Sequence, residues 1–331
     1  MTDPTSDAPV RPRRILMLGA TGQIGGATVR ALVSRGHKVV CFVRRSLARA
    51  DLTFPGAEVR FGDAADREKF AADAFRGESF DTVVSCMASR TGAPKDAWAI
   101  DYQAHADALS AAKAAGVTHF ILLSAICVQK PCLAFQHAKL KFEQELIASG
   151  LDYSIVRATA FYKSLSGQIE RVKAGKAFLV FGDGRQTACK PISDADLGAY
   201  LAACVDDPAL RNRVLPIGGP GPAITPREQG EKLFALMGRE PRFSQVPVAL
   251  LDAIIWTLSG LGMLLPSLKE KAELARIGRY YATESMLVLN PETGKYDADA
   301  TPSTGADTLF DHYARIVAGE TSVERGAHSV F

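Results

Sequence analysis

A serine, a phenylalanine and a lysine occupy the part of the chain whose residue types bear most directly on chemistry. Ser124 ends an apolar run, and Lys139 follows with Phe135 one helical turn before it. A tyrosine at position 135 would be a proton donor whose pKa the neighbouring ammonium lowers. Phenylalanine cannot donate a proton. These three positions therefore supply a cation and a hydroxyl without the usual acid.

Ser124, Phe135 and Lys139 must be positioned by the fold of the chain. The apolar runs of the sequence predict a fold in which strands and helices alternate. Strands are expected at 15–18, 39–43, 58–61, 82–85, 119–124 and 153–156, with helices at 23–34, 65–75, 97–115 and 133–149. Repeated strand–helix units specify a parallel sheet covered by helices on both faces. The sequence therefore predicts an α/β fold of the Rossmann type, with a doubly wound parallel sheet.

The turn between the first strand and the first helix is rich in glycine. Such a turn lets backbone amides and a helix N-terminus meet a pyrophosphate, because no side chain keeps the phosphates away. The turn by itself would be a weak signal, but a strand precedes it and a helix follows it. We expect the pyrophosphate of a dinucleotide to be held by Gly19, Thr21, Gly22, Gln23, Ile24 and Gly25.

The charge at the end of the second strand bears on which dinucleotide binds. An acid there would bind the ribose hydroxyls of NAD, whereas this chain has Arg44 and Arg45. Guanidinium groups pair well with a 2′-phosphate, which an acid would repel. Asp63, after the third strand, is expected to meet the edge of the adenine ring. The predicted cofactor is NADPH.

Composition excludes several other classes of protein. The 331 residues include 39 basic and 36 acidic ones, scattered along the chain, so no basic block indicates nucleic-acid binding. The 6 cysteines form no C-x-x-C pair, which argues against a zinc site, an iron–sulfur cluster or a secreted disulfide framework. Residues 1–13 resemble neither a signal peptide nor a transit peptide and are expected to be a disordered tail. The predicted location is a reducing cytoplasm.

The second half of the chain departs from the regular alternation. A strand is expected at 177–181, a helix at 194–205, a strand at 213–217 and a helix beginning at Thr225. We expect residues 14–160 to form the NADPH-binding Rossmann core, and 161–331 to complete that core and form a smaller C-terminal substrate lobe.

Residues 247–266 form an apolar stretch close to membrane-spanning length. Asp252 and prolines at both ends argue against a transmembrane span. We expect a buried or lid helix, whose apolar face could also hold a flat macrocycle or touch a membrane surface.

Four long strings of the sequence resemble the divinyl chlorophyllide a 8-vinyl-reductase family, of the NADPH-dependent type that uses neither flavin nor iron–sulfur clusters. They are residues 126–146, 154–170, 181–197 and 215–234, and the resemblance extends from about Arg14 to Gly319. Members are atypical extended short-chain dehydrogenases/reductases and look tyrosine-less at the position of Phe135. The resemblance implies reduction of the C8 vinyl group to ethyl on a magnesium tetrapyrrole, in chlorophyll or bacteriochlorophyll synthesis.

The resemblance also gives provisional roles to individual residues. Lys139 is the expected catalytic residue, and Ser124 is a second candidate. The ribose and nicotinamide of the cofactor would be lined by Ser85, Cys86, Met87, Thr159 and Phe161. Tyr162 and Lys163 could face the substrate, although an aromatic residue after a core strand more often packs. A cation for the propionate of the substrate could be Lys130, Lys163 or Lys190.

Two other functions remain open at this stage. One is an NADPH-dependent reductase of a different conjugated alkene, as in isoflavone-reductase-like enzymes. The other is a non-catalytic NADPH-sensing regulator, which the absence of a tyrosine at Phe135 would suit. The sequence leaves the oligomeric state open, and it leaves open a peripheral location at the photosynthetic membrane.

Overall fold

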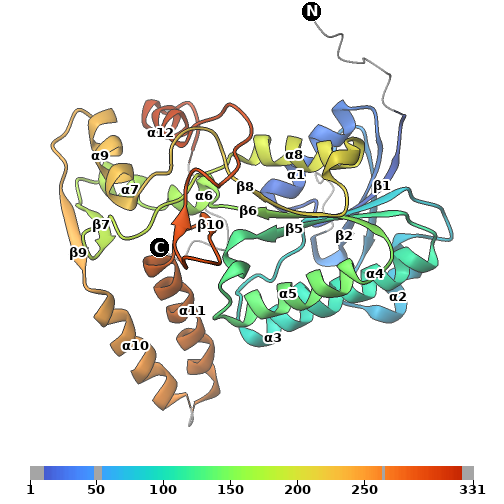
Figure 1. Ribbon diagram of the computed structural model, residues 1–331, viewed down its shortest axis with the longest axis horizontal. Coiled ribbons are helices and arrows are strands. Elements are labelled where there is room, and N and C mark those ends of the chain that lie inside the picture. The colour runs from blue at the N-terminus through green and yellow to red at the C-terminus, as the bar shows by residue number, and fades with distance from the viewer. Residues whose placement is uncertain (1–10, 48–53, 263–264, 323–331) are drawn as a thin grey trace, which may run out of the picture.

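A seven-stranded parallel sheet forms the main body of the computed structural model, which describes residues 11–47, 54–262 and 265–322 (Figure 1). The strand order is β3 (Ala57–Gly62), β2 (Lys38–Arg44), β1 (Arg14–Leu18), β4 (Thr82–Ser85), β5 (His119–Ala125), β6 (Asp152–Ala158) and β8 (Arg213–Ile217). The order reverses between β1 and β4, which is where such sheets bind dinucleotides. The predicted Rossmann-type doubly wound sheet is confirmed.

Helices cover both faces of this sheet. On one face lie α1 (Gln23–Ser34) and α8 (Asp194–Asp206), whose buried residues share a core with β1, β2 and β6. On the other lie α2 (Arg67–Ala74), α4 (His105–Ala114) and α5 (Ala134–Ile147) (Figure 1). Strands β1, β2, β4 and β5 are therefore buried on both sides, which explains why they are continuous apolar runs, whereas the edge strands β3 and β8 are partly exposed.

The helix expected over 97–115 is divided into three pieces. Helix α3 (Pro94–Ala97) leads into a π-helical segment, η2 (Trp98–Ala104), before α4 begins. A π-helix bonds each amide to the carbonyl five residues back, and π segments occur frequently at functional sites. Hydrophobic periodicity does not distinguish it from an α-helix, so the sequence predicted one continuous helix.

A second core lies beyond the sheet, in the C-terminal part of the chain. It contains a two-stranded parallel sheet of β7 (Phe178–Phe181) and β9 (Phe243–Val246), with α6 (Tyr162–Leu165), α7 (Ile169–Lys173), α9 (Pro226–Leu236) and α12 (Leu309–Ala318) around it. The antiparallel pair β10 (Val288–Leu289) and β11 (Tyr296–Asp297) follows α11 (Pro266–Thr283). Helix α9 begins as the sequence predicts, because Thr225 and Glu228 form a reciprocal capping box.

Helices α10 (Val248–Leu261) and α11 (Pro266–Thr283) form a hairpin that projects from the body (Figure 1). Of the two alternatives predicted for 247–266, the buried helix is wrong, since α10 has no buried residue and Trp256 is 80% exposed, whereas the lid helix stays a prediction. Among the described elements, α10 packs chiefly against α11. Within the described ranges, no helix combines the length and the apolarity that a membrane span requires.

Candidate functional site

The glycine turn after β1 is shaped by close approaches of backbone. Gly19 has a φ of +79°, and a Cβ there would lie 2.7 Å from the carbonyl carbon of Cys86. A Cβ on Gly25 would lie 2.0 Å from the carbonyl oxygen of Gly19, so α1 can pack this closely only on glycine. The N-cap residue of α1, Gly22, makes no side-chain cap hydrogen bond, and a helix N-terminus of this kind suits an anion. Thr21 and Gly22 are exposed, and Gln23 and Ile24 half-buried, at this end of the helix.

Two arginines lie where β2 ends, next to the end of β3. Arg44 is exposed at the last position of β2 and pairs in register with Gly62, so it lies next to Asp63. Arg45 is 69% exposed and forms an ion pair of 3.1 Å with Asp73. Asp63 turns back on its own loop, where its carboxylate accepts from the amide of Ala65 at 3.0 Å. The arrangement leaves two guanidinium groups near solvent, as a 2′-phosphate requires.

Side chains from three strand–helix junctions form one partly exposed apolar layer beside the glycine turn. Ile24, Cys86 and Phe161 all pack against the core on this side of the sheet. Met87 is half-buried against the opposite core, and its amide lies 3.4 Å from the hydroxyl of Ser85. Cys86 and Phe161 thus pack against the same core, and their place beside a nicotinamide stays a prediction.

Ser85 and Thr159 are engaged within the protein. The hydroxyl of Ser85 is fully buried and lies 2.9 Å from Nε2 of His105. Burial lowers the pKa of His105 to about 4, so this imidazole is neutral at physiological pH. The hydroxyl of Thr159, 5% exposed, donates to the carbonyl of Lys190. Both residues hold adjoining segments in place at the carboxyl ends of the strands.

Lys139 forms an enclosed ion pair with Asp101, which lies on the π-helical segment η2. The ammonium is 2.9 Å from Oδ1 of Asp101, and the two side chains are 11% and 0% exposed. The amide of Ser89 also donates to Oδ1, at 3.1 Å, while the buried Oδ2 has no partner among the described residues. Sequence reasoning missed Asp101, because an acid inside an expected helix gives no sign of its partner.

Ser124 belongs to a different cluster, one helical turn further along α5. Its hydroxyl donates to Glu143 at 2.5 Å, and the partly exposed Arg157 forms an ion pair with the same buried carboxylate. Ser124 is 3% exposed. The structure thus places this serine in a structural network, and it brings Ser124 no contact with Lys139.

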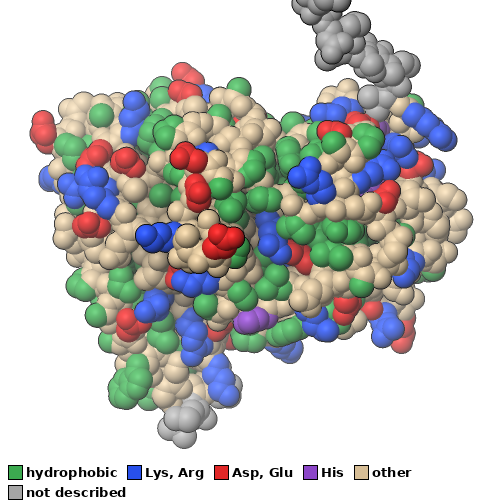
Figure 2. Space-filling model, in the orientation of Figure 1, with side chains coloured by type: hydrophobic (Ala, Val, Ile, Leu, Met, Phe, Trp, Pro, Cys, Tyr) green, Lys and Arg blue, Asp and Glu red, His purple; other side chains and the backbone are tan. Residues whose placement is uncertain are grey.

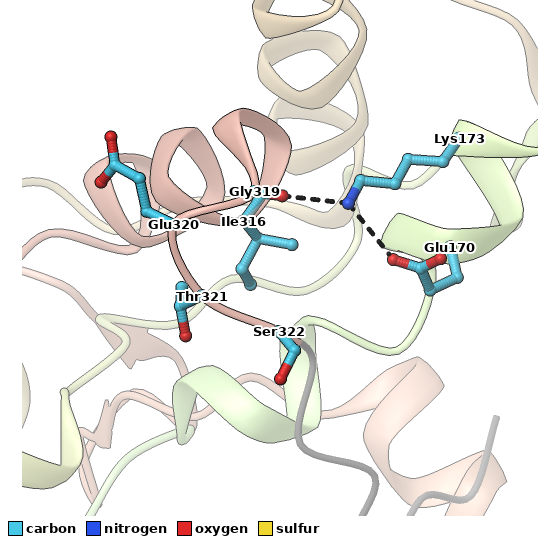
Figure 3. Close-up of a pocket in the computed structure, with 7 residues that line it drawn as sticks. All are labelled: Glu170, Lys173, Ile316, Gly319, Glu320, Thr321 and Ser322. Carbon is cyan, nitrogen blue, oxygen red and sulfur yellow. Dashed lines mark hydrogen bonds and ion pairs between the residues drawn. The ribbon is translucent and has the colours of Figure 1, made fainter.

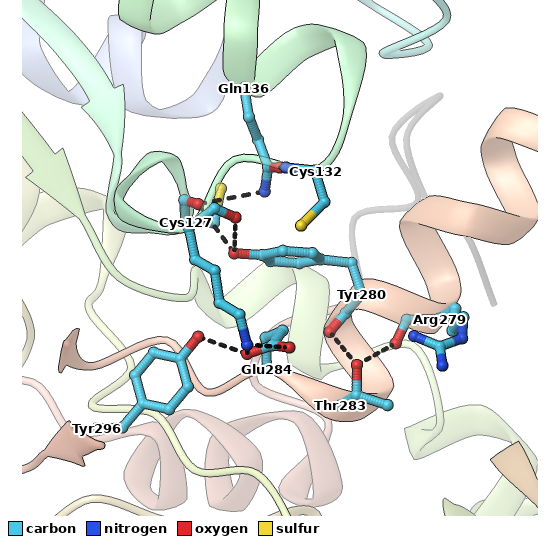
Figure 4. A network of polar contacts seen from close by, with 9 residues as sticks. Cys127, Cys132, Gln136, Arg279, Tyr280, Thr283, Glu284 and Tyr296 are labelled. Atoms are coloured by element: carbon cyan, nitrogen blue, oxygen red, sulfur yellow. Dashed lines mark hydrogen bonds and ion pairs between the residues drawn. The ribbon is translucent and has the colours of Figure 1, made fainter. Parts of the chain in front are cut away.

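The N-terminus of α5 is covered by α11. A Cβ on Gly92 would lie 3.0 Å from Cδ1 of Ile277 and 3.5 Å from Cδ1 of Phe135, so these two side chains meet above the same loop. Tyr280 donates its hydroxyl to the carbonyl oxygens of Cys127 at 2.9 Å and Lys130 at 3.1 Å (Figure 4). The last turns of α11 are therefore fixed against the segment that carries Phe135 and Lys139.

The four residues predicted to contact the substrate lie in different surroundings in the structure. The ammonium of Lys130 pairs with Glu284 at 2.7 Å, beside Tyr296 (Figure 4), and that of Lys190 donates to the carbonyl of Thr301 at 2.9 Å. Tyr162 is 4% exposed and donates to the carbonyl of Asp307, so it packs in the C-terminal core. Lys163 is half-buried, and its ammonium has no ion pair or hydrogen bond within the described residues.

Two surface cavities lie outside the predicted cofactor site. One, of about 520 Å³, is lined by α7 and by the end of α12, where Lys173 bonds Glu170 and the carbonyl of Ile316 (Figure 3). It contains none of the residues predicted to bind cofactor or substrate. The other, of about 470 Å³, lies between Ala93–Lys95 and the α10–α11 hairpin. It adjoins the loop above Phe135.

This fold and this site define an NAD(P)H-binding protein of the Rossmann type. Residues 19–208 match the NAD(P)H-binding family model. The chain is 48% identical to the divinyl chlorophyllide a 8-vinyl-reductase of Zea mays, over 98% of this chain and 84% of that protein. It is 50% identical to the enzyme of the same name from Cucumis sativus, over 96% of this chain and 79% of that protein. Both relatives are described as chloroplastic.

A solved structure gives the same fold at low identity. The NADPH-dependent quinone oxidoreductase QOR2 of Escherichia coli, complexed with NADPH, has a TM-score of 0.67 and 19% identity, over 92% of this chain and 99% of that one. The likeness is one of fold. By its sequence, this chain belongs to the divinyl chlorophyllide a 8-vinyl-reductase family.

Proposed function

We propose that this protein uses NADPH to reduce the C8 vinyl group of divinyl chlorophyllide a, or of its protochlorophyllide precursor, to an ethyl group. The observation that carries the proposal is the 48–50% identity to reductases named for this activity, which extends over nearly the whole chain. Purified protein mixed with NADPH and divinyl chlorophyllide should give the monovinyl pigment, resolved by chromatography. Absence of NADPH-dependent conversion would contradict the proposal.

The cofactor preference follows from the site. The uncapped N-terminus of α1 and the glycine turn suit a pyrophosphate, and Arg44 and Arg45 suit a 2′-phosphate. NADPH, when bound, supplies the hydride. Lys139 would donate hydrogen bonds to the nicotinamide ribose, while Asp101 keeps its ammonium in a fixed place. Cys86 and Phe161 would form the apolar wall beside the nicotinamide.

The chemistry of the substrate accounts for the absence of a tyrosine at position 135. Hydride addition to a ketone produces an alkoxide, which needs an acid directly beside it. Addition to a vinyl group on a tetrapyrrole leaves a negative charge that the macrocycle delocalises. A cation held nearby then stabilises this charge, because electrostatic interactions are strong in a site from which water is excluded. Lys139 meets that description, with an 11% exposed side chain.

Among the candidate cations for the substrate propionate, we favour Lys163. The ammonium groups of Lys130 and Lys190 are already hydrogen-bonded, and breaking those contacts would offset much of the gain from binding a carboxylate. Lys163 has no such contact within the described residues and follows Phe161 closely in the chain. A charge-assisted hydrogen bond to a carboxylate would orient the macrocycle along the nicotinamide.

The α10–α11 hairpin is proposed as a contact with an anionic membrane surface. Trp256, Leu250 and Leu265 are 80%, 51% and 57% exposed, and Asp252, the only charged residue of α10, is neutralised by Arg279. Exposed Lys269 and Lys271 follow on α11. Figure 2 shows apolar side chains on one side of the hairpin and basic ones on the other. Apolar and basic residues together are typical of helices that lie in the headgroup region.

Vesicle binding tests this contact. In a Trp98→Phe background, which leaves Trp256 as the single tryptophan, phosphatidylglycerol vesicles should shift the emission of Trp256 to the blue and sediment the protein. Trp256→Ser should abolish sedimentation. Protein that stays in the supernatant, or a dimer whose formation buries Trp256 without vesicles, would contradict it.

A further inference from the structure

The π-helical segment η2 is followed directly by a buried histidine that bonds back into it. The main-chain amide of His105 donates to the carbonyl of Tyr102, and Nδ1 of its imidazole lies 2.8 Å from the carbonyl oxygen of Ile100. His105 is 1% exposed. π-Helices are rare and occur mostly as single turns, frequently at functional sites. One residue thus closes this turn with both its main chain and its side chain.

The two contacts of the imidazole determine where its proton lies. A carbonyl oxygen can only accept, so Nδ1 must carry the proton. Burial lowers the pKa of His105 to about 4, so the ring is neutral at physiological pH and Nε2 is an acceptor. The hydroxyl of Ser85, 2.9 Å away, therefore donates to Nε2. His105 joins the π-helical turn to the end of β4 with a defined tautomer.

The turn that His105 closes carries Asp101, the partner of Lys139. The ammonium of Lys139 lies 2.9 Å from Oδ1 of Asp101, whose side chain is fully buried. A π turn holds one residue more than an α turn. Conversion of η2 to an α-helix would therefore rotate Asp101 about the helix axis and away from the ammonium.

The same segment holds the loop that follows β4. The loop begins at Ser85, whose hydroxyl donates to the imidazole. It ends at Ser89, whose amide donates to Oδ1 of Asp101 at 3.1 Å. Between them, the carbonyl carbon of Cys86 would lie 2.7 Å from a Cβ added to Gly19. The segment η2 is thus bonded to both ends of a loop that lies against the glycine turn.

From these contacts we propose that His105 is a positioning residue for hydride transfer: its imidazole holds the π-helical turn in the form that directs Asp101 to Lys139. This inference rests on the proposed function, in which the ammonium of Lys139 binds the nicotinamide ribose. His105 takes part in no bond that forms or breaks in the reaction. Its effect passes through the carboxylate of Asp101.

Two substitutions separate the two hydrogen bonds of the imidazole. In His105→Asn the amide nitrogen can replace Nδ1 and bond the carbonyl of Ile100, whereas in His105→Gln the longer side chain can replace Nε2 and bond Ser85. Misplacing a catalytic group by about 1 Å can cost roughly 10²-fold, so His105→Gln should lower kcat/KM for divinyl chlorophyllide on that scale. His105→Asn should recover most of this loss. Equal losses in the two variants, or a larger loss in His105→Asn, would overturn the proposal.

The matched control is His119→Gln. His119 is also 1% exposed and lies 3.0 Å from a serine hydroxyl, that of Ser154. It begins β5, so it lies at the edge of the sheet opposite the carboxyl ends of the strands. Both Gln variants should lower Tm, but His119→Gln should keep kcat/KM within twofold of the wild type. An equal loss of activity in His119→Gln would show general destabilisation and would overturn the proposal.

A second measurement shows whether His105 acts through Asp101. In an Asp101→Asn background, His105→Gln should cost little further kcat/KM and little further affinity for NADPH, because the contact that the imidazole maintains is already lost. Fluorescence titration gives the dissociation constant of NADPH for the wild type, both single variants and the double variant. Losses that multiply in the double variant would overturn the proposal.

Nitrogen NMR of the wild type covers the case in which a variant fails to fold. In protein labelled at its histidine rings, the imidazole of His105 should carry its proton on Nδ1 at physiological pH. A proton on Nε2 would exclude the bond to Ile100 and overturn the proposal. A wild type without reductase activity would contradict the proposed function, while the NADPH titrations and the tautomer would still test the role of His105.

Discussion

The ammonium of Lys139 lies 2.9 Å from Oδ1 of Asp101, and solvent reaches neither carboxylate oxygen. The pair joins α5 to the π-helical segment η2, and the amide of Ser89 holds Oδ1 from the opposite side. The expected catalytic lysine is thus fixed by a residue on another element. In an enclosed pair of this kind each charge depends on its partner, because an unpaired buried charge is costly.

Asp101→Asn should therefore destabilise the protein and impair turnover. Leaving a buried ammonium without its counter-ion costs about 3–5 kcal/mol, whereas removing both partners can be nearly neutral. The double variant Asp101→Asn/Lys139→Met should recover most of the unfolding free energy in urea and stay inactive. A control is Asp107→Asn, whose partner Arg67 is 79% exposed. Equal stability of the single and double variants would show that the two residues do not interact.

Lys139→Ala should abolish turnover and weaken NADPH binding, because the hydrogen bonds to the nicotinamide ribose are lost. Its control is Lys141→Ala on the same helix, where the ammonium is 49% exposed and pairs with Glu145. That variant should bind NADPH as the wild type does. Fluorescence titration and steady-state kinetics check both outcomes. Full activity of Lys139→Ala would remove the lysine from the mechanism.

Arg44→Ala should change the cofactor preference. A hydrogen bond to a charged group contributes about 1.5–3 kcal/mol, so KM for NADPH should rise roughly ten- to a hundredfold while KM for NADH stays the same. Arg30→Ala, an exposed arginine on α1, should alter neither constant. If Arg44→Ala raised both KM values equally, the guanidinium group would not bind the 2′-phosphate.

Two buried histidines predict how stability depends on pH. Burial lowers the pKa of both His105 and His119 to about 4, against about 6.5 in an unfolded chain. Below pH 6.5 the unfolded chain takes up protons that the folded protein excludes, so the unfolding free energy should fall as the pH decreases from 6.5 towards 4. Urea unfolding at pH 7, 6 and 5 measures this decrease. An unfolding free energy that stays constant over this range would contradict the assignment of neutral, buried imidazoles.

The sequence predicts the sheet, the glycine turn and the basic end of β2 because each depends on local patterns. Gly19 and Gly25 are required by contacts within one strand–turn–helix unit, and Arg44 follows its strand directly. The position of Asp101 depends on packing between distant elements. The π-helical turn that directs Asp101 inward and the hairpin that brings α11 over Phe135 leave no periodic signal. The hydrogen bond between Ser124 and Glu143 could not be predicted either, because it also joins two different elements.

The central claim is that hydride passes from NADPH to the vinyl group, and isotope labelling tests it most directly. A single turnover with NADPH that carries deuterium at both positions of C4 of the nicotinamide, followed by mass analysis of the pigment, should give a monovinyl product that carries one deuterium in its C8 ethyl group. The same reaction in D2O with unlabelled NADPH should place one deuterium on the other carbon of that group. Monovinyl product without deuterium from labelled NADPH, or no product at all, would contradict the account.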